Sequence, residues 1–114
     1  MSLLHLDFLK HILDEVTFVL EQTKDKKQDD FLKDVVLQRA VVRSLEIIGE
    51  ASKNIALDHK QKYPQIDWKE MAGTRDKLIH HYFGVDYDIV WDIIINELPE
   101  LKHEIERIIK MEEQ

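Results

Sequence analysis

Apolar residues recur at intervals of three or four along most of this chain, which is the period of an α-helix. The pattern is clear near the start of the chain, at Leu3, Leu6, Leu9, Leu13, Val16 and Leu20. Only three Gly and two Pro occur in 114 residues, and few stretches alternate strictly between apolar and polar side chains. Because strands show that alternation and turns are rich in Gly and Pro, the sequence predicts an all-α protein.

The first half of the chain is expected to form two helices. The first covers residues 2–22, with Ser2 as its N-cap, and a charged loop follows at 23–29. A long second helix starts at about Asp30 and has apolar residues over more than half of its circumference: Leu32, Val35, Val36, Ala40, Val42, Ile47, Ala51 and Ile55. A helix this apolar lies at the centre of a bundle or in an interface between chains. Gly49 within it either permits the close approach of another helix or is a mild weakness.

Proline and capping residues place the remaining helices. Pro64 ends any helix before it, and Asp67 starts a third helix in an Asp-x-x-Glu capping pattern. This helix is expected to run through to Gly84, a favourable residue for a helix end. Asp86 caps the last helical segment, which Pro99 kinks or splits. The expected fold is an up-and-down four-helix bundle with a short or kinked extra helix.

The composition narrows the functions open to the chain. Residues 1–114 fit a single domain, and the absence of Cys excludes disulfides and thiolate metal sites. A net charge of −7 argues against a general nucleic-acid coat, which needs a basic surface. The N-terminus lacks the basic start of a signal peptide, and no apolar run approaches the about 18 residues of a membrane span. We therefore expect a cytoplasmic protein without a membrane segment.

The charge is unevenly distributed. Residues 59–81 contain five Lys or Arg against three Asp or Glu, a local charge of +2, so the rest of the chain carries −9. This asymmetry is either chance or an anion-binding site on an acidic body.

The stretch GTRDKLIHHYFG at residues 73–84 concentrates an arginine, two histidines and a tyrosine on one expected helix. Asp76 and His80 are four residues apart and share a face, so the carboxylate can orient and charge the imidazole. Arg75 and His80 are five apart, about 140° around an ideal helix. They therefore flank one side of a groove, or two copies of the helix meet across a two-fold axis and complete each other's site.

These side chains suit phosphodiester chemistry. The planar guanidinium of Arg matches phosphate oxygens, and His can take and return a proton near neutral pH. In RNA the attacking group can be the adjacent 2′-hydroxyl, so the reaction requires no metal. A single Arg or His on a helix is more often solvated or satisfied in a core. A metal site at His80 and His81 is disfavoured because neighbouring helical residues point about 100° apart.

The order Arg75, His80, Tyr82 resembles the R-x4-H-x-Y motif of the HEPN superfamily, and specifically its HepT-like toxin branch. The resemblance extends over nearly the whole chain, through RAVVRSLEIIGEASKNI, WKEMAGTRDKLIHHYFGVDYDIVW and LPELKHEI. It implies an all-α bundle that forms homodimers, in which two motifs meet in a composite cleft. It also implies a metal-independent ribonuclease, in which Arg75 stabilises phosphate and His80 transfers protons. We expect no cofactor, and we take Asp76 and Lys77, which lie beside Arg75 on the expected helix, as supporting residues.

The same resemblance implies a partner. HepT-like proteins are typically toxins paired with a minimal nucleotidyltransferase antitoxin of the MntA type. The motif tyrosine, here Tyr82, is the expected acceptor of AMP, which would place bulk and negative charge at the cleft and exclude RNA.

Asp76 departs from the commonest family pattern, which has Asn after the motif Arg. An ionised Asp repels phosphate and favours the protonated form of His80, so this difference bears on the catalytic rate more than on the fold. Two other functions therefore remain open. One is a non-catalytic helical subunit that binds a nucleotidyltransferase, and the other is a degenerate domain that serves as a dimerising scaffold.

Overall fold

The computed structural model describes residues 3–78 and 84–114, and every regular element in these ranges is a helix, which confirms the expected all-α class. The elements are α1 (Leu3–Thr23), α2 (Gln28–Lys33), α3 (Val35–Lys53), α4 (Leu57–Lys62), α5 (Trp68–Ala72), α6 (Thr74–Leu78), α7 (Tyr87–Asp92), the π-helix η2 (Ile93–Glu97) and α8 (Leu98–Glu112). None of these helices is both long and apolar enough to cross a membrane.

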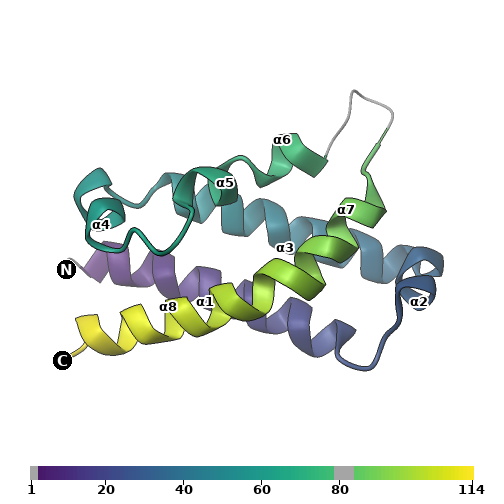
Figure 1. Cartoon of the computed structure of the whole chain (residues 1–114), viewed down its shortest axis with the longest axis horizontal. Helices are drawn as coiled ribbons and strands as arrows, with labels where there is room; N and C mark the ends of the chain where they lie inside the picture. The colour runs from purple at the N-terminus through teal and green to yellow at the C-terminus, as the bar shows by residue number, and fades with distance from the viewer. Residues whose placement is uncertain (1–2, 79–83) are drawn as a thin grey trace.

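The helices form an elongated up-and-down bundle of 43 × 31 × 20 Å (Figure 1). The helix α1 contacts both α3 and α8, and α3 also contacts α5 and α6. The continuous run α7–η2–α8 returns antiparallel to α1, and the short helices α4, α5 and α6 together take the place of one long member (Figure 1). The core lies between these layers, at Leu9, Ile12, Val16, Val19, Val41, Leu45, Ile48, Val90, Ile94, Ile105 and Ile108.

The prediction of one continuous second helix is wrong, because the chain leaves the helical conformation at Asp34 and forms two helices, α2 and α3. Asp34 has φ −103° and ψ 92°, outside the helical region, and its side chain accepts a hydrogen bond from the Leu37 N–H at 3.0 Å. An Asp at this position satisfies a free N–H of a helix start, so it favours a new helix over continuation. The break directs the Phe31 side chain into the core, where the centroid of its ring lies 5.5 Å from the centroid of the Trp91 ring.

The third predicted helix is also interrupted, at Gly73. Asp67 caps α5 as expected, accepting from the Glu70 N–H at 2.9 Å. Gly73, with φ −88° and ψ 2°, then ends α5 after five residues. Glycine loses more backbone freedom in a helix than other residues, and the Thr74 hydroxyl donates to the Glu70 carbonyl at 3.1 Å beside the break. The expected helix end before Gly84 lies outside the described residues.

The sequence predicts a kink or a break at Pro99, but the last helical segment stays continuous and is instead widened into a π turn before this residue. Pro99 lacks an N–H, so the regular pattern of the preceding turn cannot continue through it. The turn Ile93–Glu97 is a π-helix, and the Leu98 N–H donates to the Ile93 carbonyl five residues back. Asp86 caps the start of this segment as expected, accepting from the Asp88 and Ile89 N–H groups.

Gly49 permits a close helix contact, one of its two predicted roles. A Cβ at this position would lie 3.1 Å from the Met71 carbonyl oxygen of α5, which is tighter than most real contacts. Because the obstacle is backbone, a larger residue at 49 would push α5 away from α3.

Candidate functional site

The motif begins on α6, whose described part is five residues long, and so short a stretch of helix is marginal in water without tertiary contacts. Its hold on the bundle comes from tertiary contacts. Leu78 is 1% exposed, and its carbonyl accepts a hydrogen bond from the Asp86 N–H at 3.0 Å, which joins α6 to the start of α7. The structure therefore anchors the chain at residue 78, within the motif, and at residue 86, after the motif.

The predicted site residues are only partly within the described chain. Arg75 lies on the backbone of α6, but its side chain, like all of His80 and Tyr82, lies outside the described residues. Asp76 is described and is exposed, in the first turn of α6. The composite site therefore stays a prediction, with α6 as its structural base.

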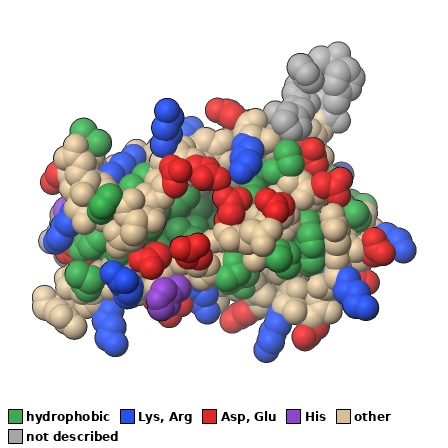
Figure 2. Space-filling model, viewed as in Figure 1, with side chains coloured by type: hydrophobic (Ala, Val, Ile, Leu, Met, Phe, Trp, Pro, Cys, Tyr) green, Lys and Arg blue, Asp and Glu red, His purple; other side chains and the backbone are tan. Residues whose placement is uncertain are grey.

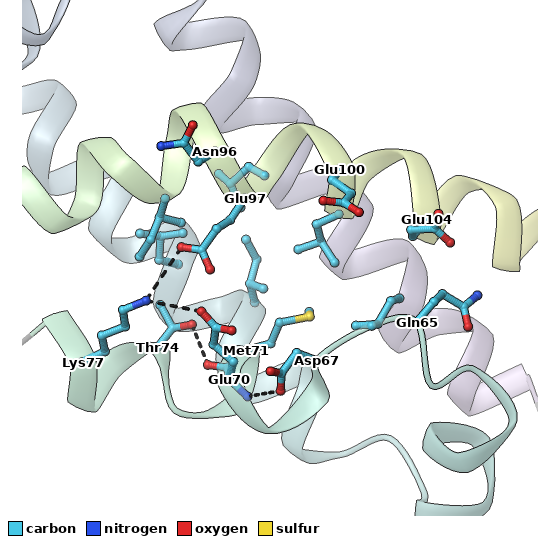
Figure 3. Close-up of a pocket in the computed structure, with 16 residues that line it drawn as sticks. Gln65, Asp67, Glu70, Met71, Thr74, Lys77, Asn96, Glu97, Glu100 and Glu104 are labelled. Carbon is cyan, nitrogen blue, oxygen red and sulfur yellow. Dashed lines mark hydrogen bonds and ion pairs between the residues drawn. The ribbon is translucent and has the colours of Figure 1, made fainter.

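Lys77, predicted to support the site, lies between two carboxyl groups. Its Nζ lies 3.3 Å from Glu70 Oε1 on α5 and 3.8 Å from Glu97 Oε2 on η2 (Figure 3). These three side chains, Glu70, Lys77 and Glu97, are called the carboxyl cluster below. Lys62, another lysine of the locally basic stretch, is paired with Glu112 at 2.9 Å. Lys62 and Lys77 of that stretch thus both lie against carboxyl groups of other helices.

A cavity of about 220 Å³ lies beside α6, between α5 and the η2–α8 segment. Figure 2 shows it as an apolar hollow with acidic side chains around it. The apolar part comes from Leu45, Ile48, Ile66, Met71, Ile93, Leu98 and Leu101, and the polar rim from Gln65, Asp67, Glu70, Thr74, Lys77, Asn96, Glu97, Glu100 and Glu104. The carboxylates turn the rim acidic, so this hollow is unsuited to RNA phosphates.

Glu97 is the most perturbed carboxyl group at this rim. Burial, followed by a hydrogen bond with the Glu70 carboxyl, raises the pKa of Glu97 to about 7. The hydrogen bond with Glu97, followed by that with Lys77, lowers the pKa of Glu70. The Oε2 atom of Glu97 is buried without a hydrogen-bond donor unless one of the two carboxyl groups carries a proton. The pair therefore favours a state in which a single proton is shared.

Sequence reasoning missed Glu70 and Glu97 as functional candidates. Glu70 was assigned only to the capping pattern, and Glu97 lies in an ordinary amphipathic segment. The one available signal was Pro99, two residues further on, which marks the irregular turn that orients Glu97.

Metal ligands do not gather within the described ranges. No group of three or more His, Asp or Glu side chains there could hold a metal ion. The neighbouring pair His80 and His81 lies outside those ranges.

Comparison with known proteins assigns the family. The model of the family described as ribonuclease HepT-like matches residues 12–108. "Putative RNase TTE0752" of Caldanaerobacter subterraneus subsp. tengcongensis is 51% identical over 92% of this chain and 94% of its own length. "Putative RNase MJ0127" of Methanocaldococcus jannaschii is 55% identical over 90% of this chain and 85% of its own length.

A third relative, "Probable ribonuclease HepT" of Thermococcus cleftensis, is 47% identical over 93% of this chain and 96% of its own length. No solved structure gives a significant match. The family match spans most of the helical bundle and includes α6 with the whole R-x4-H-x-Y motif. This chain therefore belongs to the ribonuclease HepT-like family of the HEPN superfamily.

Proposed function

We propose that this chain is a toxin-type, metal-independent endoribonuclease that acts as a homodimer with a composite site. The observation that carries the proposal is the order Arg75, His80, Tyr82 within a chain that matches the ribonuclease HepT-like family over residues 12–108. The relatives named as RNases match nearly end to end, so the ribonuclease class extends to the whole chain.

The proposed reaction uses the RNA itself as nucleophile. His80 takes the proton of a 2′-hydroxyl, whose oxygen forms a bond to phosphorus while the bond between phosphorus and the 5′-oxygen breaks. The protonated His80 then returns the proton to the leaving 5′-oxygen, so the products are a 2′,3′-cyclic phosphate and a 5′-hydroxyl. Arg75 stabilises the charge that develops on the phosphate oxygens. Because Arg75 and His80 are five residues apart, the two groups converge best when they come from different subunits.

An exposed apolar surface supports the homodimer. Leu32, Val35 and Val36, which surround the α2–α3 junction, are 40%, 58% and 80% exposed, and they are called the apolar patch below. Helix α2 contacts α7, and Gln28 Nε2 donates to Asp88 Oδ1 at 3.0 Å. Since α7 follows the motif directly, a second subunit on the apolar patch would lie at the motif end of the bundle (Figure 1).

Chelation provides the test of the reaction class. Purified protein incubated with RNA and excess EDTA is expected to keep its cleavage activity and to leave 2′,3′-cyclic phosphate and 5′-hydroxyl ends. These ends follow from attack by the neighbouring 2′-hydroxyl. Activity lost on chelation and restored by a divalent cation would contradict the metal-independent mechanism. Intact RNA under all conditions would refute the ribonuclease and leave the non-catalytic binding subunit and the dimerising scaffold as the remaining functions.

The proposal includes a nucleotidyltransferase antitoxin of the MntA type, which silences the toxin by transferring AMP to Tyr82. Incubation with the partner enzyme and ATP is expected to add whole AMP masses to the peptide that contains Tyr82, with parallel loss of RNA cleavage, because the added phosphates repel RNA. Tyr87, a half-buried tyrosine at the start of α7, serves as the internal control. AMP found on Tyr87, or on neither tyrosine, would refute this mode of regulation.

A further inference from the structure

The carboxyl cluster ties the motif helix to two other parts of the bundle. Lys77 extends from α6 to Glu70 of α5 and to Glu97 of η2, at 3.3 and 3.8 Å. The Thr74 hydroxyl adds a hydrogen bond from α6 to the backbone of α5. Figure 3 shows these contacts converging at one end of the cavity, directly beside α6. A five-residue helix depends on such contacts for its orientation.

The π-helical turn places Glu97 within this cluster. The Leu98 N–H bonds to the Ile93 carbonyl, so one extra residue is accommodated before α8 begins. Without this extra residue, the side chains that follow the turn would be rotated by about 100° around the helix axis. Isolated π turns are rare and occur frequently at functional sites. The chain thus contains a rare turn whose consequence is a carboxyl group directed at α6.

The charges around Glu97 make its ionisation costly. It faces Glu70 from α5, Lys77 from α6 and Asp92 from α7, while α8 contributes Glu100 and Glu104 to the same cavity. The residues that α3 presents there, Leu45 and Ile48, are apolar. One ammonium group therefore faces several carboxyl groups in partly dehydrated surroundings, and a protonated Glu97 relieves both the burial and the repulsion.

We propose that Glu97 is a positioning residue for RNA cleavage, which through Glu70 and Lys77 holds α6, and with it Arg75, in the active orientation. With Glu97 protonated, its O–H donates to Glu70, Lys77 pairs with Glu70, and the cluster is neutral. With Glu97 ionised, the cluster carries one net negative charge and α6 is held less firmly. This inference rests on the proposed function for its effect on catalysis, but its structural part does not.

The sign of the pH effect follows from the raised pKa of Glu97. Its pKa of about 7 in the folded protein lies above the ordinary value of 4.5. Its contribution to stability is therefore complete below pH 4.5 and is lost as the pH rises through 7. We therefore expect the contacts of α6 with the carboxyl cluster to weaken as the pH rises above about 7.

The test combines nuclear magnetic resonance with kinetics on the full-length chain. In the wild type, the side-chain carboxyl carbon of Glu97 and the backbone amides of Thr74–Leu78 are expected to titrate together, with a midpoint near pH 7. In Glu97→Gln, which keeps the size of the side chain without its ionisation, the shared midpoint in α6 is expected to disappear. Glu106→Gln, an exposed position on α8, is the matched control and is expected to behave as wild type.

Kinetics test the catalytic part. Between pH 6 and pH 8 the wild-type kcat for RNA cleavage is expected to fall by about tenfold more than that of Glu97→Gln, because a displaced Arg75 loses transition-state contacts. The inference would be overturned if the amide chemical shifts of α6 do not change with pH, or if they titrate with the same midpoint in Glu97→Gln. A wild type that cleaves no RNA at any pH would refute the proposed function instead, and the wild-type titration would still decide whether Glu97 controls α6.

Discussion

Replacing His80 by Ala is expected to lower the rate of RNA cleavage by about 10²–10⁴-fold, the usual contribution of a positioned acid–base group. Replacing Arg75 by Ala is expected to cost about 10²–10³-fold, because the charge on the phosphate oxygens loses its partner. Growth inhibition by the expressed protein is expected to disappear with either change. Single-turnover cleavage of a labelled RNA measures both losses.

Two control variants match these changes in chemistry. His103→Ala and Arg107→Ala remove the same side-chain types from exposed positions of α8 and are expected to leave cleavage intact. Circular dichroism should show the same helix content in all four variants. Wild-type rates in both His80→Ala and Arg75→Ala, in protein free of other nucleases, would exclude this site. Inactivity of the wild type as well would refute the ribonuclease and leave the two non-catalytic functions, the binding subunit and the dimerising scaffold.

Replacing Val36 by Asp is expected to convert the dimer to a monomer and to lower cleavage in parallel. Val36 is 80% exposed in the single chain, so a charge there costs the fold little. In a two-fold interface the change occurs twice, and each buried Val contributes about 1.5–3 kcal/mol. The dimer dissociation constant should therefore rise by at least about 100-fold. Sedimentation equilibrium measures this rise, and cleavage assays at matched protein concentrations measure the activity.

The matched control for this change is Leu57→Asp. Leu57 is 69% exposed at the start of α4, away from the apolar patch (Figure 1). This variant is expected to remain dimeric and active. A Val36→Asp protein that stays dimeric with full activity would place the subunit interface elsewhere on the molecule.

The helical fold was readable from the sequence because its signals are local. The three- and four-residue spacing predicted α1 closely, and Asp67 and Asp86 cap the helices that they were expected to start. Two helices that the apolar periodicity predicts to be continuous are interrupted, at Asp34 and at Gly73, because these residues favour a helix start and a helix end. Asp34 is itself a helix-starting residue, and it interrupts a run whose periodicity continues on both sides.

The electrostatics beside the motif were not readable from the sequence. Lys77 and Glu97 are twenty positions apart, and their contact depends on where the folded bundle places η2 relative to α6. The π turn that directs Glu97 to α6 depends in turn on Pro99 and on the apolar residues that bury Ile93 and Ile94. A motif search names the residues of a reaction, whereas the groups that orient its helix come from the tertiary packing.

Complementation between inactive subunits tests the composite site most directly. Arg75→Ala and His80→Ala proteins, each inactive alone, are unfolded together, refolded as a mixture and assayed for RNA cleavage. If each site takes Arg75 from one subunit and His80 from the other, mixed dimers regain one intact site, and the mixture should recover roughly a quarter of wild-type activity. A mixture that forms mixed dimers but stays inactive would show that both groups act within one chain, and would contradict the shared cleft.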